Sequence, residues 1–295
     1  MVDYKFLKNL KKLRAEYILI IILLVFTFVI CALAFIQGQH KYLKLAFLDI
    51  GQGDAIYVEA PNGKQMLIDG GSGRGVLLQL RQVMPFGDHS IDMLVITNPD
   101  HDHDAGFIDV LNNYDVKAVL EPGTYSPTKT YAKLEQLIKD KNVQKEIARR
   151  GMKILLDKEK NISFDILFPD RDVSNFSRND GSIVGKIVYG KESFMMMGDA
   201  TAYTESIVAR NETPEILNAN VLKLGHHGSR TSSSSLWLET VHPELAIISA
   251  GLHNRYGHPH KEVLDRLMAF HIPYLGTYQK GTIVCNTDGV LMNCK

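Results

Sequence analysis

The sequence predicts an α/β protein, a four-layer α/β/β/α sandwich with a single membrane-spanning helix in front of it. Each half of the chain begins with short apolar runs separated by glycine turns and continues with helical segments. Two such halves, with their helices on the outside, bury two sheets against each other. The chain of 295 residues, 45% apolar and 22% charged, is large enough for such a core.

The predicted membrane helix covers residues 17–36, YILIIILLVFTFVICALAFI, which contain one clearly polar residue, Thr27, and no charge. At about 1.5 Å per residue, this run spans a hydrocarbon core of roughly 30 Å. Five cationic residues precede it, so the positive-inside rule predicts a cytoplasmic N-terminus. We therefore expect a single-pass protein of the cell membrane, with a basic cytoplasmic tail over 1–16, a transmembrane anchor over 17–36, a linker over 37–41 and an extracytoplasmic domain over 42–295.

A cleaved signal peptide is the alternative for the same apolar run. Ala32-Leu33-Ala34 offers a small-x-small cleavage site, and a chain beginning near Phe35 would be secreted. The run is longer than the roughly 7–15 apolar residues of a signal peptide, which favours the uncleaved anchor.

The first half of the domain is expected to form a β-meander followed by alternating helices and strands. Gly51-Gln52-Gly53 and Pro61-Asn62-Gly63 separate its first three apolar runs. The expected strands are Leu43–Leu48, Ala55–Glu59, Gln65–Asp69, 93–97, Lys117–Leu120 and further strands within Gln144–Pro169. The expected helices are Val76–Val83, Asp104–Asn112 and the amphipathic Tyr131–Lys141.

The second half repeats this style, with strands first and helices later. Ser182–Tyr189 and Ser193–Met197 are expected to pair around the turn Gly190-Lys191. The further strands expected are Val221–Leu224, Leu245–Ala250 and a terminal hairpin. The expected helices are Tyr203–Arg210, Leu236–Val241 and Glu262–Phe270.

The cysteines indicate no zinc-type site, so any metal must be held by histidine and carboxylate. Cys285 and Cys294 flank the turn signal Asn286-Thr287-Asp288-Gly289, whereas the third cysteine lies in the apolar run. A two-residue turn at Asp288-Gly289 would pair Cys285 with Met292, which leaves a disulfide between Cys285 and Cys294 open.

The net charge of zero is unevenly distributed. Residues 1–41 carry six basic and two acidic residues, and the remaining 27 basic and 31 acidic residues give residues 42–295 a net charge of −4. A domain of this charge has no general attraction for polyanions. Nucleic-acid binding would therefore need a local basic patch or the charge of bound metal ions.

The strongest chemical signal is TNPDHDHDAG at residues 97–106, which follows a short apolar strand. It places Asp100, His101, Asp102, His103 and Asp104 in consecutive positions. Crowded carboxylates and imidazoles are favourable when a cation lies among them, and both are good ligands of divalent metals. The alternative is an Asp-rich solvated turn, but further clusters later in the chain favour a metal.

These later clusters also follow predicted strands. Asp199 comes directly after one strand, His226 and His227 lie between two glycines after the next, and His258 follows a third. The glycines let the backbone turn sharply, and we expect one of the two adjacent histidines to be a core residue. Ligands in α/β folds gather at one end of their strands, which predicts that these clusters meet.

The ordered motifs FLDIGQGDA, LIDGG, TNPDHDHDAG, MGDA, VLKLGHHGSRTSSS and NRYGHP resemble the metallo-β-lactamase-like domain of the ComEC family of DNA-uptake proteins. The resemblance covers residues 43–285. It implies the metallo-β-lactamase four-layer αββα sandwich and the activity of a metal-dependent nuclease. The N-terminal helix and the absence of a polytopic channel domain differ from full-length ComEC. The chain therefore looks like a stand-alone, membrane-tethered version of one domain.

The resemblance also implies a set of metal ligands for one or two divalent ions. The fold's general loop is His-x-His-x-Asp-His. Asn98 and Asp100 stand at the first two histidines, Asp102 and His103 match the last two positions, and Asn179 stands where the broader fold has another histidine. The implied ligands are Asp100, Asp102, His103, Asp199, His226, His227 and His258. This oxygen-rich set favours Mn²⁺ or a mixed site over two Zn²⁺ ions, and Mg²⁺ is also possible.

The expected mechanism is attack of a metal-activated water on a phosphodiester. The expected catalytic residues are Asp102, His258 and Lys223. Asp102 or Asp199 orients the water, His258 or His227 protonates the leaving oxygen, and Lys223 holds the phosphate. The expected substrate-binding residues are Asn98, Asn179, Lys223, Ser229, Arg230, Ser232 and Arg255. The residues expected to support the site are Asp49, Gln52, Asp54 and Asp69.

The function predicted from the sequence is thus a membrane-anchored, extracytoplasmic metal-dependent phosphodiesterase or nuclease. Its expected partners are a nucleic-acid substrate, with DNA favoured, and the membrane, and the sequence predicts no protein partner. Two alternatives remain open. One is a hydrolase of a small non-nucleic substrate, which the negative domain charge favours. The other is a non-catalytic tethered module with a degenerate metal site, which Asn98 favours.

Overall fold

The computed structural model describes residues 16–31 and 42–295, and the chain separates into two compact units, Met1–Lys41 and Tyr42–Lys295. Within the first unit, residues 16–31 form a helix. The described residues contain no helix with the length and apolar character needed to cross a membrane. The predicted single-pass membrane localisation is therefore wrong. The predicted anchor over 17–36 is not supported by the described residues, and residues 1–15 and 32–41 lie outside them.

The first sheet of the second unit has eight strands, and its order returns the end of the chain to the first strand. The order is β15 (Met292–Cys294), β14 (Ile283–Thr287), β1 (Leu43–Phe47), β2 (Ile56–Glu59), β3 (Gln65–Ile68), β4 (Ser90–Val95), β5 (Asp115–Glu121) and β6 (Gln144–Ile147). Pairing is antiparallel from β15 to β3 and parallel from β3 to β6.

The second sheet has seven strands and is antiparallel on one side and parallel on the other. Its order is β13 (Tyr274–Gly276), β12 (Leu245–Ile248), β11 (Val221–Lys223), β10 (Glu192–Met196), β9 (Val184–Tyr189), β8 (Ile162–Phe168) and β7 (Lys153–Asp157). The prediction of one sheet in each half is thus correct only in outline, because the terminal hairpin β14–β15 joins the first sheet. The residues 144–169 are likewise divided between the sheets, with β6 in one and β7 and β8 in the other.

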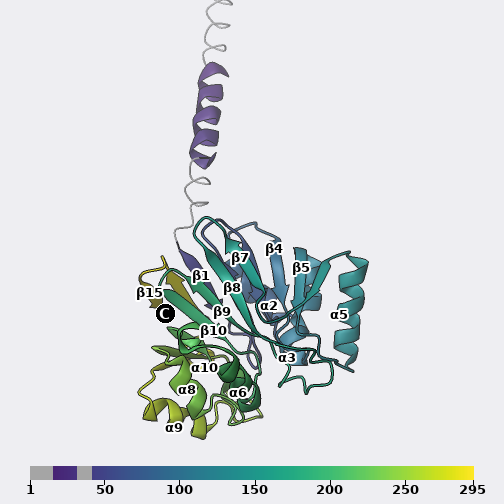
Figure 1. Ribbon diagram of the computed structural model, residues 1–295. Helices are drawn as coiled ribbons and strands as arrows, with labels where there is room; N and C mark the ends of the chain where they lie inside the picture. Colours follow the sequence, from purple (N-terminus) through teal and green to yellow (C-terminus); the bar gives the residue numbers. More distant parts are fainter. Residues whose placement is uncertain (1–15, 32–41) are drawn as a thin grey trace, which may run out of the picture. The chain divides into compact units, whose positions relative to one another are not determined.

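Nine helices of the second unit are described, and they cover the outer faces of the two sheets (Figure 1). Those of the first half are α2 (Gly75–Val83), α3 (His101–Asp104), α4 (Gly106–Asn113) and α5 (Lys129–Asp140). Those of the second half are α6 (Ala202–Asn211), α7 (Pro214–Leu217), α8 (Ser235–Val241), α9 (Lys261–Ala269) and α10 (Thr277–Lys280). The predicted helix over Asp104–Asn112 corresponds to α4, and a further short helix, α3, covers His101–Asp104 of the acidic stretch.

Three buried apolar clusters define the four layers. Side chains such as Phe47 of β1 and Phe164 of β8 pack together between the two sheets. A second cluster joins the first sheet to α2, α4 and α5, and a third joins the second sheet to α6, α8 and α9, where Trp237 of α8 is fully buried. This is the predicted αββα sandwich, confirmed for the described part of the chain. This sandwich is stabilised because the two sheets bury apolar faces against each other and the helices bury their apolar sides against the outer sheet faces.

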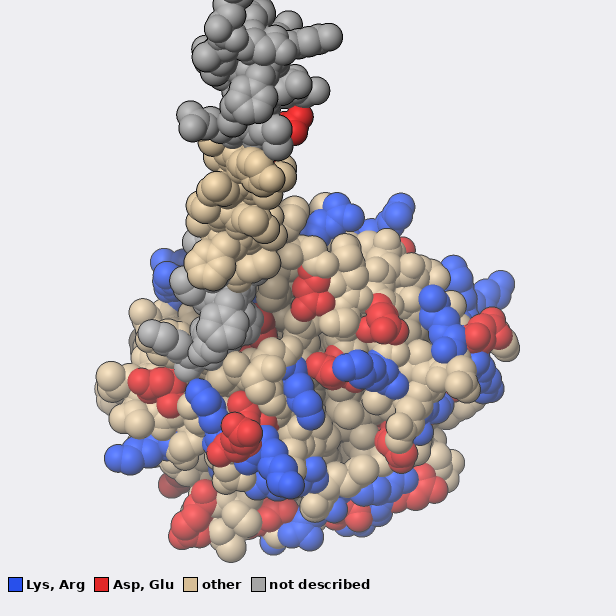
Figure 2. Space-filling view, turned by 90° about the horizontal axis from the view of Figure 1, so that it is seen from above, with Lys and Arg blue, Asp and Glu red and all other residues tan. Residues whose placement is uncertain are grey.

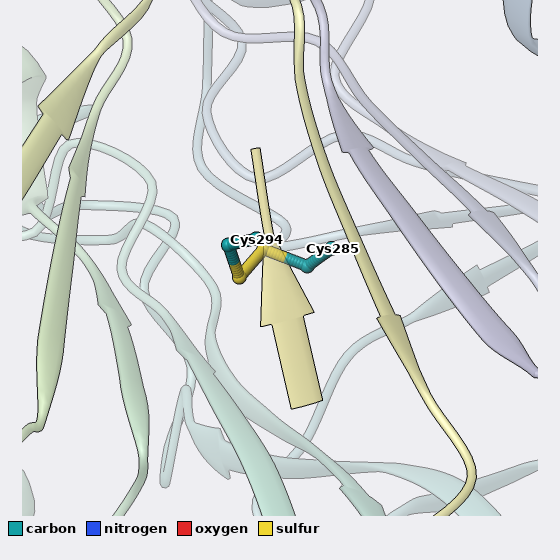
Figure 3. The surroundings of a disulfide bond; sticks show 2 residues. All are labelled: Cys285 and Cys294. Atoms are coloured by element: carbon teal, nitrogen blue, oxygen red, sulfur yellow. A yellow bond between two sulfur atoms is a disulfide. The ribbon is translucent and has the colours of Figure 1, made fainter. Parts of the chain in front are cut away.

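A disulfide joins Cys285 of β14 to Cys294 of β15 (Figure 3). The expected two-residue turn is wrong: the loop between the strands comprises residues 288–291, so Thr287 pairs with Met292 and Cys285 pairs with Cys294. Asp288 fixes this longer loop, because its Oδ1 accepts hydrogen bonds from the backbone N–H groups of Val290 and Leu291 at 3.0 and 2.9 Å. The open question of the disulfide is thus answered by loop length.

We expect the double substitution Cys285→Ala and Cys294→Ala to lower the free energy of unfolding by about 2–3 kcal/mol, since the disulfide restricts a short loop in the unfolded chain. Urea unfolding under non-reducing conditions measures the change. The matched control is Cys31→Ala, a free cysteine in the other unit. An equal unfolding midpoint for the double variant and the control would show that the bridge does not stabilise the domain.

Candidate metal centre

The candidate ligands lie at the carboxyl ends of strands from both sheets. The parallel strands β3 and β4 lead into Asp69 and the acidic stretch, and the parallel strands β10, β11 and β12 lead into the segments bearing Asp199, His226–His227 and His258. Parallel strands present their carboxyl ends at one edge, and both edges face the same cavity here. The structure therefore brings together the acidic stretch and clusters that lie 95 or more residues later in the sequence.

Glycines allow the acidic stretch to pack closely on two other loops. A Cβ at Gly53 would lie 2.3 Å from the carbonyl oxygen of Asp102, and a Cβ at Gly106 would lie 1.9 Å from the carbonyl oxygen of Gly70. The Gly70 N–H donates to the carbonyl oxygen of His103 at 2.6 Å. Backbone contacts this close exclude any larger residue, which explains Gly53, Gly70 and Gly106.

Asp199, His103 and His227 form the centre of the site. Asp199 Oδ1 lies 3.1 Å from His103 Nε2 and 3.4 Å from His227 Nε2, and Asp102 Oδ2 lies 3.3 Å from His227 Nε2. Asp199 Oδ1 and both Nε2 atoms are buried without a hydrogen-bond partner among the described residues. Buried polar atoms are costly to leave unpaired, so converging atoms of this kind fit a cation that binds them all.

Hydrogen bonds on the opposite ring nitrogens orient two of these imidazoles. His103 Nδ1 lies 2.8 Å from Asp69 Oδ2, and Asp69 in turn accepts from the Thr97 N–H and hydroxyl at 2.8 and 2.5 Å. His227 Nδ1 lies 3.1 Å from the carbonyl oxygen of Ser249. With Nδ1 held in this way, the Nε2 atom of each ring points at Asp199, an arrangement typical of metal-binding histidines.

The adjacent histidines adopt the left-handed backbone conformation, with φ of 49° for His226 and 56° for His227. This sharp turn lets both rings line the cavity: His227 is buried, and His226 is partly exposed, with its Nε2 3.7 Å from Asp199 Oδ2. Thr231 Oγ1 lies 3.1 Å from His226 Nδ1. The expectation that one of the pair is a core histidine holds for the burial of His227, yet His227 also faces the cavity.

Electrostatics divide the imidazoles into two kinds. Burial alone would lower the pKa of His227, but the Asp199 and Asp54 carboxylates raise it to about 10. The same balance raises the pKa of His103 well above its usual value, through Asp199 and Asp69. Burial, together with His227 and His226, instead lowers the pKa of His258 to about 4. A neutral His258 suits a metal ligand, and the role of His258 as the acid predicted from the sequence stays a prediction.

Asp100 lines the cavity but is paired with an arginine. Its Oδ1 lies 2.8 Å from Arg178 Nε, and burial raises the pKa of Asp100 despite this cation. Nearby, the fully buried Asn98 donates its Nδ2–H to Asn179 Oδ1 at 2.8 Å. The two asparagines at positions where the wider fold has histidines thus bond to each other, and Asn179 alone reaches the cavity lining.

The cavity has a volume of about 270 Å³. Its lining residues are Gln52, Asp100, His101, Asp102, Asn179, Asp199, His226, His227, Tyr256 and His258. Most of the predicted ligands are therefore in this lining, and His103 lies directly behind it, within 3.1 Å of Asp199. All seven predicted metal ligands lie in or beside one cavity, and their role as ligands remains a prediction.

Three of the predicted substrate-binding residues do not reach the cavity. Lys223 is buried, and its Nζ is bonded to Asp54 Oδ2 at 2.8 Å and to the carbonyl oxygen of Leu224 at 2.9 Å. Ser232 is fully buried and donates to the carbonyl oxygen of Ala200, and Asn98 faces Asn179. These side chains have partners inside the protein and do not contact the cavity.

The other predicted residues lie around the site. Gln52 lines the cavity, and its Oε1 accepts from the Gly251 N–H at 3.2 Å. Asp49 accepts from the Gly51 N–H at 3.3 Å and so holds the loop that carries Gln52. Ser229 is buried beside Thr231, and Arg230 pairs with Glu262 at 3.5 Å on the surface. Arg255 lies against Tyr256 at the cavity rim.

Sequence reasoning missed two residues of the site. Arg178, which pairs with Asp100, lies in a loop without any motif, and no signal in the sequence could have identified it. His101 lines the cavity, and its place within the acidic stretch was the available signal.

The donors of this site fit a divalent metal ion. Two groups of side chains bring their ligand atoms within 4.8 Å of one another: Asp102, His103 and His227 in one, and Asp54, His103 and Asp199 in the other. Carboxylate oxygens and imidazole nitrogens together suit Zn²⁺ and Mn²⁺ alike.

Fold and site define a class of protein. Residues 48–252 match the metallo-beta-lactamase superfamily, and the chain belongs to that superfamily. It is 33% identical to ComE operon protein 3 of Bacillus subtilis (80% of this chain, 32% of that protein) and 30% identical to Recombination protein 2 of Haemophilus influenzae (90% and 31%). It is also 30% identical to Competence protein ComA of Neisseria gonorrhoeae (80% and 31%). The chain spans about a third of the length of these relatives.

Proposed function

We propose that this protein is a metal-dependent hydrolase that cleaves phosphodiester bonds of DNA. The observation that carries the proposal is the convergence of the unpaired Asp199 Oδ1, His103 Nε2 and His227 Nε2 beside the acidic stretch, in a cavity open to solvent. Structural metal sites are usually enclosed by protein, whereas hydrolytic sites keep a position for water and substrate. The described ligands leave room for both.

The chain's own residues would perform the positioning steps. Asp199, His103, His227 and Asp102 would hold a divalent ion, which when bound would supply positive charge to polarise a phosphoryl oxygen and acidify water. Asp102, partly exposed at the cavity wall, accepts a proton from the attacking water or orients it. Asn179 also lines the cavity, and its amide N–H can donate to a phosphate oxygen.

The names of the relatives support DNA as the substrate, whereas the charge of this protein's surface offers little attraction for it. Relatives with competence and recombination names resemble 80–90% of this chain, which favours a DNA substrate. Figure 2 shows acidic and basic side chains interspersed over the described part of the face it presents. Attraction for a polyanion must therefore come from the bound cation and a few local residues.

We expect Asp102→Ala to lower DNA hydrolysis by on the order of a hundredfold or more, because it removes a cavity-lining carboxylate needed for the ion and for the water. The assay is cleavage of labelled single- and double-stranded DNA by the purified full-length chain with Mn²⁺, Mg²⁺ or Zn²⁺. Asp109→Ala on α4 is the matched control, since Asp109 lies outside the cavity lining. Undiminished cleavage by Asp102→Ala would remove the acidic stretch from the mechanism.

The hydrolysis of a small non-nucleic ester is the second candidate. The acidic cavity wall and the net charge of −4 over residues 42–295 favour a substrate with less negative charge than DNA. Turnover of a small phosphodiester or carboxylic ester without cleavage of DNA of any form would support this candidate over the first.

A further inference from the structure

A second hollow adjoins the candidate metal cavity. It has a volume of about 350 Å³, within the range of small-ligand sites. Its lining residues are Gln52, Ser72, His101, Asp102, Asn254, Arg255 and Tyr256. Gln52, His101, Asp102 and Tyr256 line both spaces, so a ligand held in the metal cavity has room to continue into the second hollow.

Three flat groups form a wall between the two spaces. The Arg255 guanidinium lies 4.8 Å from the centre of the Tyr256 ring, and its Nη2 donates to the Tyr256 hydroxyl at 2.6 Å. The Tyr256 and His258 rings are stacked, with centres 5.6 Å apart and an angle of 19° between their planes. Tyr256 is nonetheless 48% exposed, and Arg255 is exposed as well, so the wall presents the guanidinium and the uncovered part of the Tyr256 ring to a ligand.

The loop that carries this wall is held in place before any ligand binds. Asn254 Oδ1 accepts from the N–H groups of Tyr256 and His258 at 3.1 and 3.0 Å, and its Nδ2 donates to the carbonyl oxygens of Gly251 and His258 at 2.9 and 2.6 Å. A preorganised loop loses little conformational entropy on binding. The wall is therefore suited to a ligand, whereas an exposed tyrosine on a loose loop would not be.

The charge of the second hollow differs from that of the metal cavity. Among the described residues that line the two spaces, Arg255 is the one lysine or arginine, and Asp100, Asp102 and Asp199 are acidic. A guanidinium both stacks on a flat ring and pairs with a phosphate oxygen. An aromatic surface beside a single guanidinium fits a ligand that combines a flat ring with an anionic group, as a nucleotide does.

We propose that the second hollow binds the nucleotide next to the scissile phosphate, with its base against the Arg255–Tyr256 wall, and that the substrate is consequently an unpaired strand. This inference rests on the proposed function. A base inside a duplex has both faces covered by its neighbours, whereas an unpaired base has a face free for stacking on protein. The wall would therefore select single-stranded over double-stranded nucleic acid.

The test compares Tyr256→Ala with Tyr256→Phe, which keeps the ring, and with Phe86→Ala, an exposed aromatic in the loop before β4, at the opposite end of that strand from the site. Two substrates are used with the full-length chain and Mn²⁺: a single-stranded hexathymidylate and a small methyl aryl phosphodiester. Since stacking of a base on an aromatic side chain is worth roughly tenfold in binding, we expect Tyr256→Ala to raise the KM for the oligonucleotide by about that factor, and far more than for the small ester. Tyr256→Phe, which keeps the ring, should restore most of the affinity lost in Tyr256→Ala, and Phe86→Ala should match the wild type.

Equal KM values for Tyr256→Ala and the wild type on the oligonucleotide, or equal cleavage of single strands and duplexes, would overturn the proposal. An equal loss on both substrates would also overturn it, because that result indicates damage to the metal cavity. If neither substrate is hydrolysed, the proposed function fails, but fluorescence anisotropy of the labelled oligonucleotide still tests whether the second hollow binds it. Weaker binding by Tyr256→Ala, with unchanged binding by Phe86→Ala, supports the proposal. Equal binding by Tyr256→Ala and the wild type refutes it.

Discussion

Asp199→Asn is expected to weaken metal binding in the cavity strongly and to lower hydrolysis with it. Asp199 Oδ1 lies between His103 Nε2 and His227 Nε2, at 3.1 and 3.4 Å, and Oδ2 faces His226. The two imidazoles lower the pKa of Asp199 far below its usual range despite its burial, so the group is an anion at every physiological pH. An amide in its place supplies one neutral oxygen and a nitrogen that cannot coordinate. We expect a loss of metal affinity on the order of a hundredfold.

Metal content after dialysis, measured by mass spectrometry, together with the rate of ester hydrolysis, checks this expectation. Asp115→Asn is the matched control, because Asp115 is exposed at the start of β5, away from the carboxyl ends of the strands. A thermal unfolding curve separates loss of the site from loss of the fold. Retention of the wild-type metal content by folded Asp199→Asn would show that the ion binds elsewhere.

Lys223→Met is expected to destabilise the fold by about 3–5 kcal/mol, as for other buried ion pairs that lose one partner. Lys223 and Asp54 are each 1% exposed, and their Nζ–Oδ2 distance is 2.8 Å. Burial opposes ionisation of Asp54, but Lys223 and His227 keep its pKa well below the usual range. The substitution therefore leaves a buried carboxylate without its main cationic partner, directly behind His227.

Urea unfolding of the full-length chain measures this loss. Lys117→Met is the matched control: Lys117 pairs with Asp92 at 2.6 Å but is 64% exposed, and such surface pairs contribute about 0–1 kcal/mol. The double variant Lys223→Met, Asp54→Asn should recover part of the stability, since it also removes the buried charge. A loss no larger than that of Lys117→Met would mean that Lys223 does not hold a buried pair in solution.

The fold was largely predictable because the apolar pattern of each element reports its burial. The run Gln65–Ile68, for example, is wholly buried in the structure and was expected as a strand from its composition. The local sequence pattern does not indicate which of the two sheets a strand joins. The β14–β15 hairpin pairs with β1, more than two hundred residues away, and the four residues between the strands set a register that a turn signal alone misjudged.

The site was predictable where a side chain follows a strand end within a distinctive motif, as for Asp102, His103 and Asp199. It was not predictable where the role depends on a distant partner. Lys223 follows an apolar run beside the paired histidines and seemed placed for a phosphate, but Asp54, 169 residues earlier, holds it in the interior. Arg178 reaches Asp100 only because the loop before β9 folds over the acidic stretch.

The central claim is that side chains from both sheets bind one divalent cation at Asp199. The most direct measurement is a crystal structure of the full-length chain grown with Mn²⁺, with anomalous scattering recorded near the manganese edge. We expect an anomalous peak about 2.0–2.3 Å from Asp199 Oδ1 and from the Nε2 atoms of His103 and His227. The absence of a peak at this position in a fully folded protein, or a peak held by other residues alone, would contradict the account.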